Sequence, residues 1–218
     1  MKKVTFFKKN GLSLALLGLF LLSWAGQTLT GWKVYNEELQ EDNALPVSFF
    51  NYLQSGHFIS ATFENWESEF LQMFIFVVFS IFLFQWGSTE SKALDDDDEV
   101  NEKPNQRTSP HRMVRRGGIF LWVYANSLSI VLFLFFLFSF SAHSWGSYRY
   151  HQKQEMLKQQ QAEPFWEYIG SSDFWFESFQ NWQSEFLSVF VIVYFTIFLR
   201  QKGSSQSKPV DALDTENE

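Results

Sequence analysis

The stretch FENWESEFLQ, residues 63–72, returns near the other end of the chain as FQNWQSEFLS, residues 179–188. Each copy leads directly into an uncharged apolar segment. Aligned with itself at an offset of 116 residues, the chain has 17 identical residues in the 28 positions that pair 65–92 with 181–208. These identities include Asn, Ser, Glu, Gln, Gly and Lys, which apolar composition alone cannot bring into register. The sequence therefore predicts a tandem duplication.

Four uncharged apolar runs organise the chain. An α-helix needs about 20 mostly apolar residues to cross a hydrocarbon layer ~30 Å thick, and the first and third runs reach that length directly. The second and fourth reach it when the turn that begins at Trp66 or Trp182 is included, with these tryptophans as interface anchors. Buried helices of a soluble protein would need amphipathic partner helices, which the polar connecting loops do not supply. We therefore expect an all-α integral membrane fold with four transmembrane helices, near 11–31, 66–86, 118–144 and 182–200.

The first apolar run also resembles a secretory signal peptide, because MKK precedes it and Ala25-Gly26-Gln27 offers a cleavage site. However, its opening NGLSLALL, from residue 10, has the counterpart NSLSIVLF from residue 126, where no signal peptide can lie. The run is also long for the apolar part of a signal peptide. We interpret it as a retained helix.

Each predicted repeat is a helical hairpin, in which a long polar and aromatic loop joins an outgoing and a returning helix. Because two crossings bring the chain back to its starting side, the hairpins should be parallel repeats, related by an axis along the membrane normal. We expect a first repeat, an acidic and basic cytoplasmic linker, a second repeat and an acidic tail, at 1–92, 93–117, 118–208 and 209–218.

The basic residues indicate the orientation. Three regions, before the first helix, between the second and third, and after the fourth, hold 13 of the 17 Lys and Arg residues. Basic residues favour the cytoplasmic side, whereas Asp and Glu contribute little to orientation. The sequence therefore predicts a multi-pass protein of the cell (inner) membrane with both termini and the central loop in the cytoplasm.

The composition excludes several kinds of site. There is no cysteine, so disulfides, thiolate metal sites and Cys nucleophiles are ruled out. The four histidines are scattered and lack the HxxxH or HExxH spacing of a metal site. The net charge of −7 argues against nucleic-acid binding. We therefore expect no catalytic residues, no metal, no other cofactor and no enzymatic activity.

The repeated box places a carboxylate and an amide on one helix face, since Asn65 and Glu69 are four residues apart, as are Asn181 and Glu185. A structural interpretation puts each Glu in the first helical turn, facing the positive end of the helix dipole. A functional interpretation makes Glu69 and Glu185 a pair where the two repeats pack, with Asn65 and Asn181 beside them. Such a pair could bind a cation, relay a proton or receive a basic group of a partner.

Two further carboxylates of the first box, Glu64 and Glu67, are left out of this pair. The second copy has Gln180 and Gln183 at the matching positions, so the duplication does not repeat their charge. On this reasoning the candidate site contains only residues that both copies share.

The GSxxSK sequences at 87–92 and 203–208 follow the second and fourth runs. We expect Gly to end each helix, and Lys92 and Lys208 to face the anionic lipid headgroups of the inner surface. The loops inside each repeat are too aromatic for plain linkers. They should lie on the outer headgroup layer as short amphipathic helices, or form a partner site.

The pattern of NGLSL, TGWKVYNEE, TFENWESEFLQ and FLFQWGSTESK resembles an uncharacterised family of bacterial four-helix membrane proteins, classed as a domain of unknown function. The resemblance covers nearly the whole chain. It implies a bacterial cell-membrane protein of two tandem hairpins and supplies no activity. The second copy has SYRYHQKQE where the first has GWKVYNEE, so no role is assigned to Glu37 or Glu38.

The function that fits these features is a non-enzymatic integral membrane protein with a structural or partner-binding role. Its expected partners are the lipid bilayer and either another membrane protein or a second copy of the chain. The alternative is a small transporter or ion-conducting subunit that uses the paired carboxylates Glu69 and Glu185.

Overall fold

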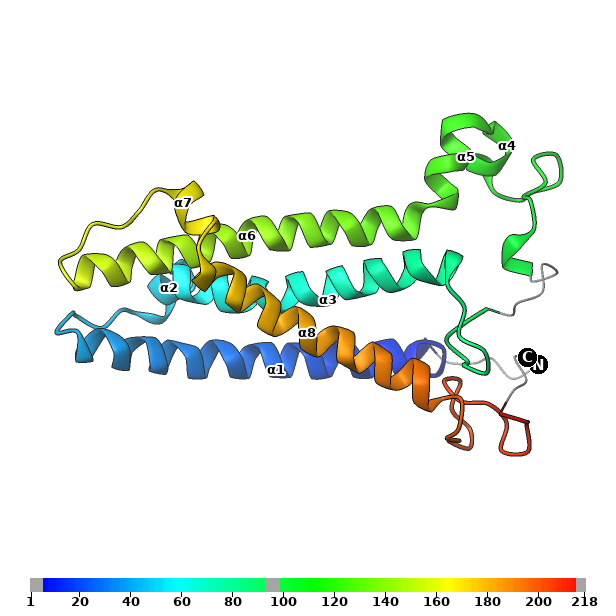
Figure 1. Ribbon diagram of the computed structural model, residues 1–218, viewed down its shortest axis with the longest axis horizontal. Helices are drawn as coiled ribbons and strands as arrows, with labels where there is room; N and C mark the ends of the chain where they lie inside the picture. Colours follow the sequence, from blue (N-terminus) through cyan, green and yellow to red (C-terminus); the bar gives the residue numbers. More distant parts are fainter. Residues whose placement is uncertain (1–5, 93–98, 215–218) are drawn as a thin grey trace. The chain divides into compact units, whose positions relative to one another are not determined.

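The structure, a computed structural model, describes residues 6–92 and 99–214 (Figure 1). Part of the predicted linker (93–98) and part of the acidic tail (215–218) lie outside the described residues, as does Met1 to Thr5. Every regular element of the described residues is a helix, which confirms the all-helical class. These helices are α1 (Phe6–Glu41), α2 (Phe49–Tyr52), α3 (Gly56–Phe82), η1 (Glu99–Asn101), α4 (Arg112–Arg116), α5 (Gly118–Ala125), α6 (Ser127–Leu157), α7 (Phe165–Ile169) and α8 (Ser172–Phe195).

At the loops inside the repeats, the helices extend beyond the predicted apolar runs. At their opposite ends, α3 and α8 stop before the predicted ends. Helix α1 continues past residue 31 to Glu41, while α3 and α8 begin at Gly56 and Ser172, well before the expected starts at 66 and 182. Polar and aromatic residues there continue the helix, because none of them is proline and the one glycine, Gly56, lies at the first position of α3. The predicted loops inside the repeats are correspondingly short.

The third predicted helix, near 118–144, begins where expected, at Gly118, but it is interrupted at Asn126 and ends later, at Leu157. The chain bends at Asn126, which has φ −108° and ψ 13° and separates α5 from α6. The Asn126 side-chain amide donates to the carbonyl of Trp122 over 2.8 Å, alongside the backbone bond to the same oxygen. Asparagine side chains compete with the helical backbone in this way, which explains the break within an uncharged sequence.

Two helices of the described residues, α1 and α6, are long and apolar enough to cross a membrane by length and composition. Helices α3 and α8 do not meet the same criterion. Their apolar parts end at Phe82 and Phe195, short of the predicted ends at 86 and 200, and the polar box occupies much of the remainder. The four-helix membrane arrangement therefore stays a prediction.

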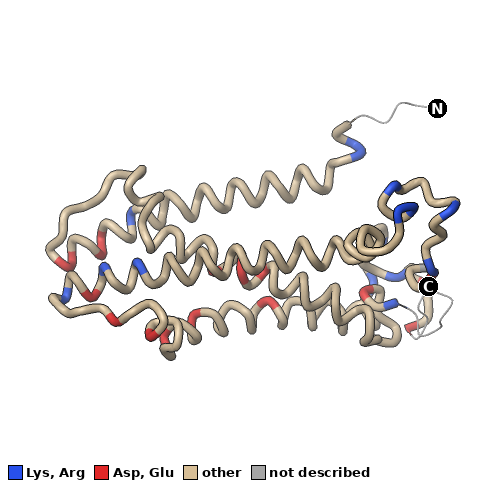
Figure 2. The backbone as a smooth tube through the Cα atoms, turned by 90° about the horizontal axis from the view of Figure 1, so that it is seen from above, with Lys and Arg blue, Asp and Glu red and all other residues tan. Residues whose placement is uncertain are grey.

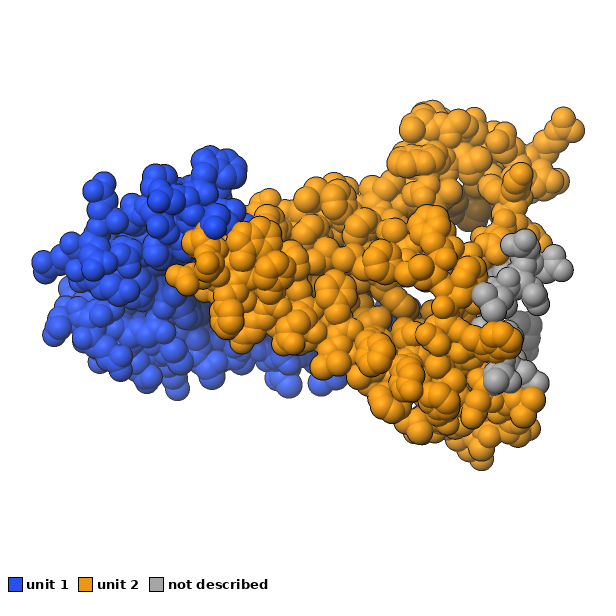
Figure 3. Space-filling view, viewed as in Figure 1, with its two compact units in different colours: residues 1–62, 142–170 blue, residues 63–141, 171–218 orange. Residues whose placement is uncertain are grey.

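The chain divides into two compact units, coloured separately in Figure 3. Unit 1 comprises residues 1–62 and 142–170, and unit 2 comprises 63–141 and 171–218. Each unit contains residues from both predicted repeats, and the division falls inside the continuous helices α3 and α6.

Unit 1 has a small aromatic core built around Tyr35 and Leu39 of α1 and Tyr52 of α2, all buried. The loop after α1 closes over this core because the indole N–H of Trp32 donates to the carbonyl of Val47 over 2.9 Å. These contacts hold α2 against α1.

The same arrangement occurs 116 residues later in unit 1. The Tyr148 hydroxyl donates to the carbonyl of Glu163 over 3.2 Å, at the positions that correspond to Trp32 and Val47. The rings of His151 and Tyr168 stack with centroids 4.6 Å apart, at the positions of Tyr35 and Tyr52. The two segments therefore fold alike although their side chains differ.

Helices α3 and α6 approach very closely within unit 1, at two glycines. A Cβ atom added to Gly146 would lie 2.5 Å from the backbone nitrogen of Ser60, and one added to Gly56 would lie 2.4 Å from the nitrogen of Tyr150. Small residues permit such backbone contact between helices, particularly in membranes. The helix crossing therefore depends on the absence of side chains at these positions.

Replacing Gly146 by alanine should destabilise the protein by about 1–3 kcal/mol, because the added methyl group overpacks the crossing. Unfolding in detergent, followed by heat or by titration with dodecyl sulfate, measures this loss. Gly26→Ala in α1 is the matched control, since its added Cβ meets no other segment within 4 Å. Equal losses of stability in the two variants would contradict the close approach.

Candidate functional site

The repeated box lies in unit 2, in the middle of α3 and α8 rather than at their ends. Helix α8 is capped upstream, where the hydroxyl of Ser171 accepts from the backbone N–H of Phe174. The interpretation of Glu69 and Glu185 as helix-start residues is therefore wrong. Its physical reason is that the aromatic residues before each box continue the helix instead of forming a loop.

The two boxes meet through carboxylates that sequence reasoning left out. The side-chain amide of Asn181 donates to the Oε1 atom of Glu64. The indole Nε1–H of Trp182 donates to the Oε1 atom of Glu67 over 2.8 Å. The Asn-Trp pair of the second copy thus binds the two carboxylates that only the first copy carries. We call these four residues the carboxylate–indole contact.

Glu67 is fully buried, with 0% of its surface exposed. Placing a carboxyl group out of water is costly unless hydrogen bonds compensate for its lost hydration. The indole N–H of Trp182 is one such donor, and Trp is well suited because its large apolar ring excludes water around the bond. Ser68, the next residue, is also buried, and its hydroxyl donates to the carbonyl of Asn65 over 2.9 Å. The face of α3 that carries Glu67 is therefore an internal one.

A sequence signal for this contact did exist. Glu64 and Glu67 are three residues apart and lie on one helical face. The Glu-to-Gln differences between the copies keep a carbonyl-type acceptor at both positions while removing the charge from one copy. Differences between two copies of a box can mark the residues through which the copies contact each other.

The structure brings Glu69 and Glu185 close enough to interact as like charges. Glu69 is exposed and Glu185 is half-buried. Of their amide neighbours, Asn65 is exposed and Asn181 donates to Glu64. A functional site formed by these four residues stays a prediction.

The predicted anchors Trp66 and Trp182 are both half-buried. The Trp66 ring packs edge-on against Phe63, with centroids 5.1 Å apart, and Trp182 packs in the same way against Phe179, at 5.5 Å. The matching pairs lie 116 residues apart. Trp182 also donates its indole N–H to the buried carboxylate of Glu67, so its role extends beyond anchoring.

Electrostatics around the boxes are one-sided. Helices α3 and α8 contain no Lys or Arg, so no basic residue of either helix neutralises their carboxylates. These carboxylates are Glu64, Glu67, Glu69, Asp173, Glu177 and Glu185. Within residues 6–92 and 99–214, no group of three or more His, Asp or Glu side chains is arranged to hold a metal ion. What these carboxylates can do is accept hydrogen bonds, take up protons or attract cations.

The two GSxxSK loops of unit 2 share one backbone design. The hydroxyls of Ser91 and Ser207 accept from the backbone N–H groups of Gln85 and Gln201, over 2.9 and 2.7 Å. Gly87 and Gly203 have φ values of 83° and 85°, which glycine adopts without strain. The helices have already ended before these glycines, so each Gly forms the turn rather than the helix end.

The lysines that end these loops differ. Lys92 is half-buried and its ammonium group donates to Oδ1 of Asn101 over 3.0 Å. Lys208 is 5% exposed and donates to the carbonyl of Asp214 over 2.9 Å, so the prediction that it faces lipid headgroups is wrong. The cause is the C-terminal segment, which folds back and is held by an ion pair between Arg200 and Asp214 at 2.8 Å.

A second polar cluster lies in unit 1 and includes Glu38, to which the sequence assigned no role. The Tyr150 hydroxyl donates to Glu38 over 2.9 Å, and the Tyr52 hydroxyl is 3.3 Å from Nδ1 of His57. Burial lowers the pKa of His57, and the charge of Glu38 partly opposes this. Burial, followed by repulsion from Glu38, raises the pKa of Tyr52 to about 12. The cluster therefore favours neutral His57 and neutral Tyr52.

These observations define an all-helical protein with two helices able to span a membrane by length and composition, and with a carboxylate–indole contact in one unit. Residues 3–218 match the family described as "Domain of unknown function (DUF6766)", and the chain belongs to this family. The predicted resemblance to a family of unknown function is thereby confirmed. The chain matches no curated protein and no solved structure.

Changing Trp182 to phenylalanine removes the indole N–H but keeps an aromatic ring. The buried Glu67 then loses this donor, and we expect the free energy of unfolding to fall by about 1–3 kcal/mol. Glu67→Gln keeps a carbonyl acceptor for the indole and gives the first box the residues NWQSEF. It should stay within about 1 kcal/mol of the original chain at neutral pH.

Thermal unfolding in detergent measures both effects. The matched control is Trp166→Phe in α7, where the ring is 80% exposed. A Trp182→Phe variant as stable as this control would show that the indole bond contributes nothing to the fold.

Proposed function

We propose that this chain is a multi-pass integral membrane protein of the bacterial cell membrane, built by tandem duplication, with both termini in the cytoplasm. Its four crossing segments are α1, the apolar part of α3, α6 and the apolar part of α8. We propose a non-enzymatic role, in which the protein serves as a membrane scaffold that binds a partner through its exposed helix faces. The proposal includes no cofactor and no nucleic acid.

The observation that carries the membrane proposal is the bare surface of α1. Only 6% of its most apolar stretch is buried, and Leu12, Leu19 and Leu22 have 75%, 62% and 72% of their surface exposed. Soluble proteins rarely expose apolar patches of this extent. A surrounding bilayer removes the cost of exposure, since lipid tails are as apolar as leucine.

Because the chain has no cysteine, single cysteines report its topology directly. A membrane-impermeant maleimide should label Asp42→Cys and Gln160→Cys on intact cells, but Arg107→Cys and Lys202→Cys only after the cells are opened. All four positions are exposed, so folding alone does not hide them. Labelling of Gln160→Cys and Lys202→Cys from the same side would refute the four-segment topology.

The partner-binding role is supported by a hollow of about 460 Å³ between α3 and α8 in unit 2. Apart from Gln72 it is lined by apolar side chains: Ile75, Phe76, Phe79, Phe186, Val189 and Phe190. Glu64 and Glu67 accept hydrogen bonds from Asn181 and Trp182, which favours a structural role for these two carboxylates. The hollow is thus suited to an apolar side chain of a partner helix, from another membrane protein or a second copy.

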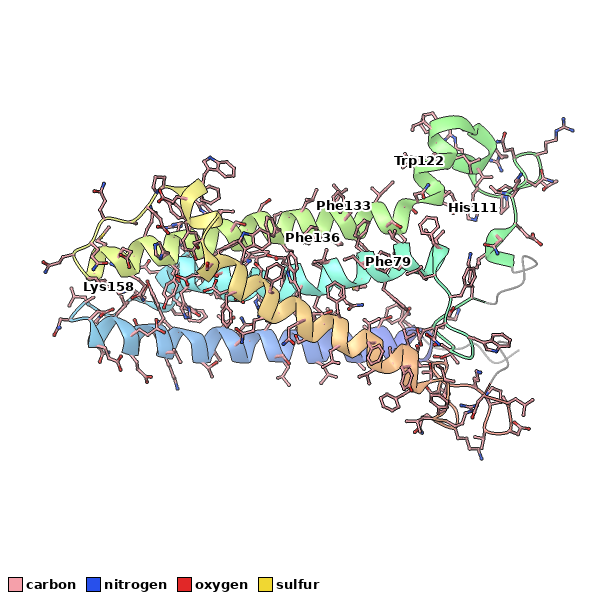
Figure 4. All side chains as sticks on the ribbon, in the orientation of Figure 1. Phe79, His111, Trp122, Phe133, Phe136 and Lys158 are labelled. Carbon is pink, nitrogen blue, oxygen red and sulfur yellow. The ribbon has the colours of Figure 1, made fainter. Side chains whose placement is uncertain are left out.

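Phe79 is 52% exposed at this hollow and projects from α3 in Figure 4. A photoreactive phenylalanine analogue placed there should crosslink to protein in native membranes, giving either a dimer of the chain or a defined heterologous product. Mass spectrometry of the product separates these two outcomes, and the same analogue at Leu16 is the control for general membrane proximity. Crosslinks to lipid alone at Phe79 would contradict the partner-binding role.

The second candidate function, a small transporter or ion-conducting subunit, is favoured by the like-charge interaction of Glu69 and Glu185. Two carboxylates that repel each other tend to share a proton or attract a cation. Ionisable residues inside membranes mark ion and proton pathways for this reason.

If this second function holds, vesicles containing the purified protein should show a proton or cation flux that protein-free vesicles lack. Glu69→Gln combined with Glu185→Gln should reduce the flux at least tenfold. Glu167→Gln, at an exposed position of α7, is the control for loss of a carboxylate outside the boxes and should leave the flux unchanged. A wild-type flux no greater than that of empty vesicles would end this alternative.

A further inference from the structure

Helices α4 and α5 of unit 2 form a short hairpin that the sequence did not predict. The chain turns at Gly117 and Gly118, whose φ values of 66° and 54° are both in the left-handed region. The Gly117 N–H closes α4 by donating to the carbonyl of Val114, and Val114 itself is buried. Figure 1 shows α5 leaving the axis of α6 at their junction. We call residues 112–125 the α4–α5 hairpin.

The approach to this hairpin is basic although the whole chain is acidic. Residues 103–116 contain five Lys or Arg, and there is no Asp or Glu between Lys103 and Gln154. Figure 2 shows the basic positions gathered on the segment that leads into α5. The local charge is therefore strongly positive, whereas the net charge of the chain is −7.

The three arginines of α4 are not equivalent. Arg115 is engaged internally, because its Nη1 donates to the carbonyls of Ser109 and Pro110 over 3.0 and 3.2 Å. The guanidinium of Arg116 lies over the Phe120 ring at 5.1 Å. Arg112 and Arg116 are both exposed. These two arginines can present planar forks of N–H donors to a phosphate group.

The hairpin also carries partly exposed apolar side chains. Ile119, Phe120 and Trp122 have 65%, 47% and 58% of their surface exposed, and Trp122 projects from α5 in Figure 4. Beside them is a hollow of about 340 Å³ lined by Met113, Ile119, Phe120, Val123, Tyr124 and Ser127. A hollow of this kind offers an acyl chain extensive apolar contact and almost no polar partner.

We propose that the α4–α5 hairpin binds an anionic phospholipid of the membrane surface on its own side. The phosphate lies against Arg112 and Arg116, and an acyl chain lies along the apolar hollow. Basic residues next to exposed aromatic residues are the general chemistry of helices that rest in an anionic headgroup layer. In this arrangement the break at Asn126 lets α5 lie along the membrane interface instead of continuing the axis of α6.

This inference rests on the proposed membrane location, and the experiment is arranged so that the two can fail separately. The full chain is reconstituted into nanodiscs of phosphatidylcholine, with or without phosphatidylglycerol, and carries one spin label on a single cysteine. Labels at Leu16→Cys in α1 and Ile119→Cys in the hairpin are compared by their accessibility to oxygen and to a water-soluble nickel chelate. Thermal unfolding confirms that each variant is folded.

The expected result is that the Leu16 label is shielded from the nickel chelate in both lipids. The Ile119 label should become shielded mainly when phosphatidylglycerol is present, and added salt should reverse this because it screens surface charge. Arg112→Gln with Arg116→Gln should remove most of the shift. Lys103→Gln with Arg107→Gln, which loses the same charge outside the hairpin, should preserve it.

Three results would overturn the proposals in different ways. If the chelate reaches the Ile119 label in both lipids while the Leu16 label is shielded, lipid binding by the hairpin is refuted. The proposed membrane location is then unaffected. An Ile119 label inaccessible to both reagents indicates a protein cover and also refutes it. A Leu16 label open to the chelate refutes the membrane location itself.

Discussion

The internal order of unit 2 depends on one desolvated acceptor. Glu67 has no exposed surface, and the indole of Trp182 supplies a donor from the neighbouring helix. Hydrogen bonds are directional, whereas the surrounding contacts between Phe side chains allow helices to slide and rotate. The Asn181 amide on Glu64 adds a second fixed point on the same pair of helices. Together these bonds define the register of α3 against α8, which apolar packing in an aromatic-rich protein leaves poorly specified.

The helical class could be predicted because long apolar runs without proline favour helices over other structures. Helix ends could not, since the residues before Trp66 and Trp182 are neutral toward helix formation and tertiary packing decides their state. The helix breaks at Asn126 because the Asn126 side chain hydrogen-bonds to the backbone. A hydropathy pattern contains no information about such a bond. The residues that both copies share did not identify the contact between the boxes. Glu64 and Glu67 contact the second copy, and contact between copies does not require identical residues.

The two units use polar groups differently. In unit 2, Glu64 and Glu67 lie on a helix without Lys or Arg and accept hydrogen bonds from an amide and an indole of α8. In unit 1 Glu38, Tyr150, Tyr52 and His57 form a compact aromatic and polar cluster, in which burial favours neutral His57 and Tyr52. Low surrounding polarity strengthens every satisfied bond of this kind and penalises every unsatisfied one. Both clusters therefore specify a particular packing as well as offering groups that can take up a proton.

The paired GSxxSK loops have a consequence for how such a protein can diversify. Their backbones are fixed by the same serine and glycine positions, yet Lys208 grips carbonyls of the chain's own final segment, while Lys92 reaches Asn101 at a separate place. The same turn thus positions a lysine whose hydrogen-bond partner depends on the surrounding chain and not on the motif. In a protein with two copies of this turn, one lysine can secure the chain's final segment while the other bonds to a different part of the chain.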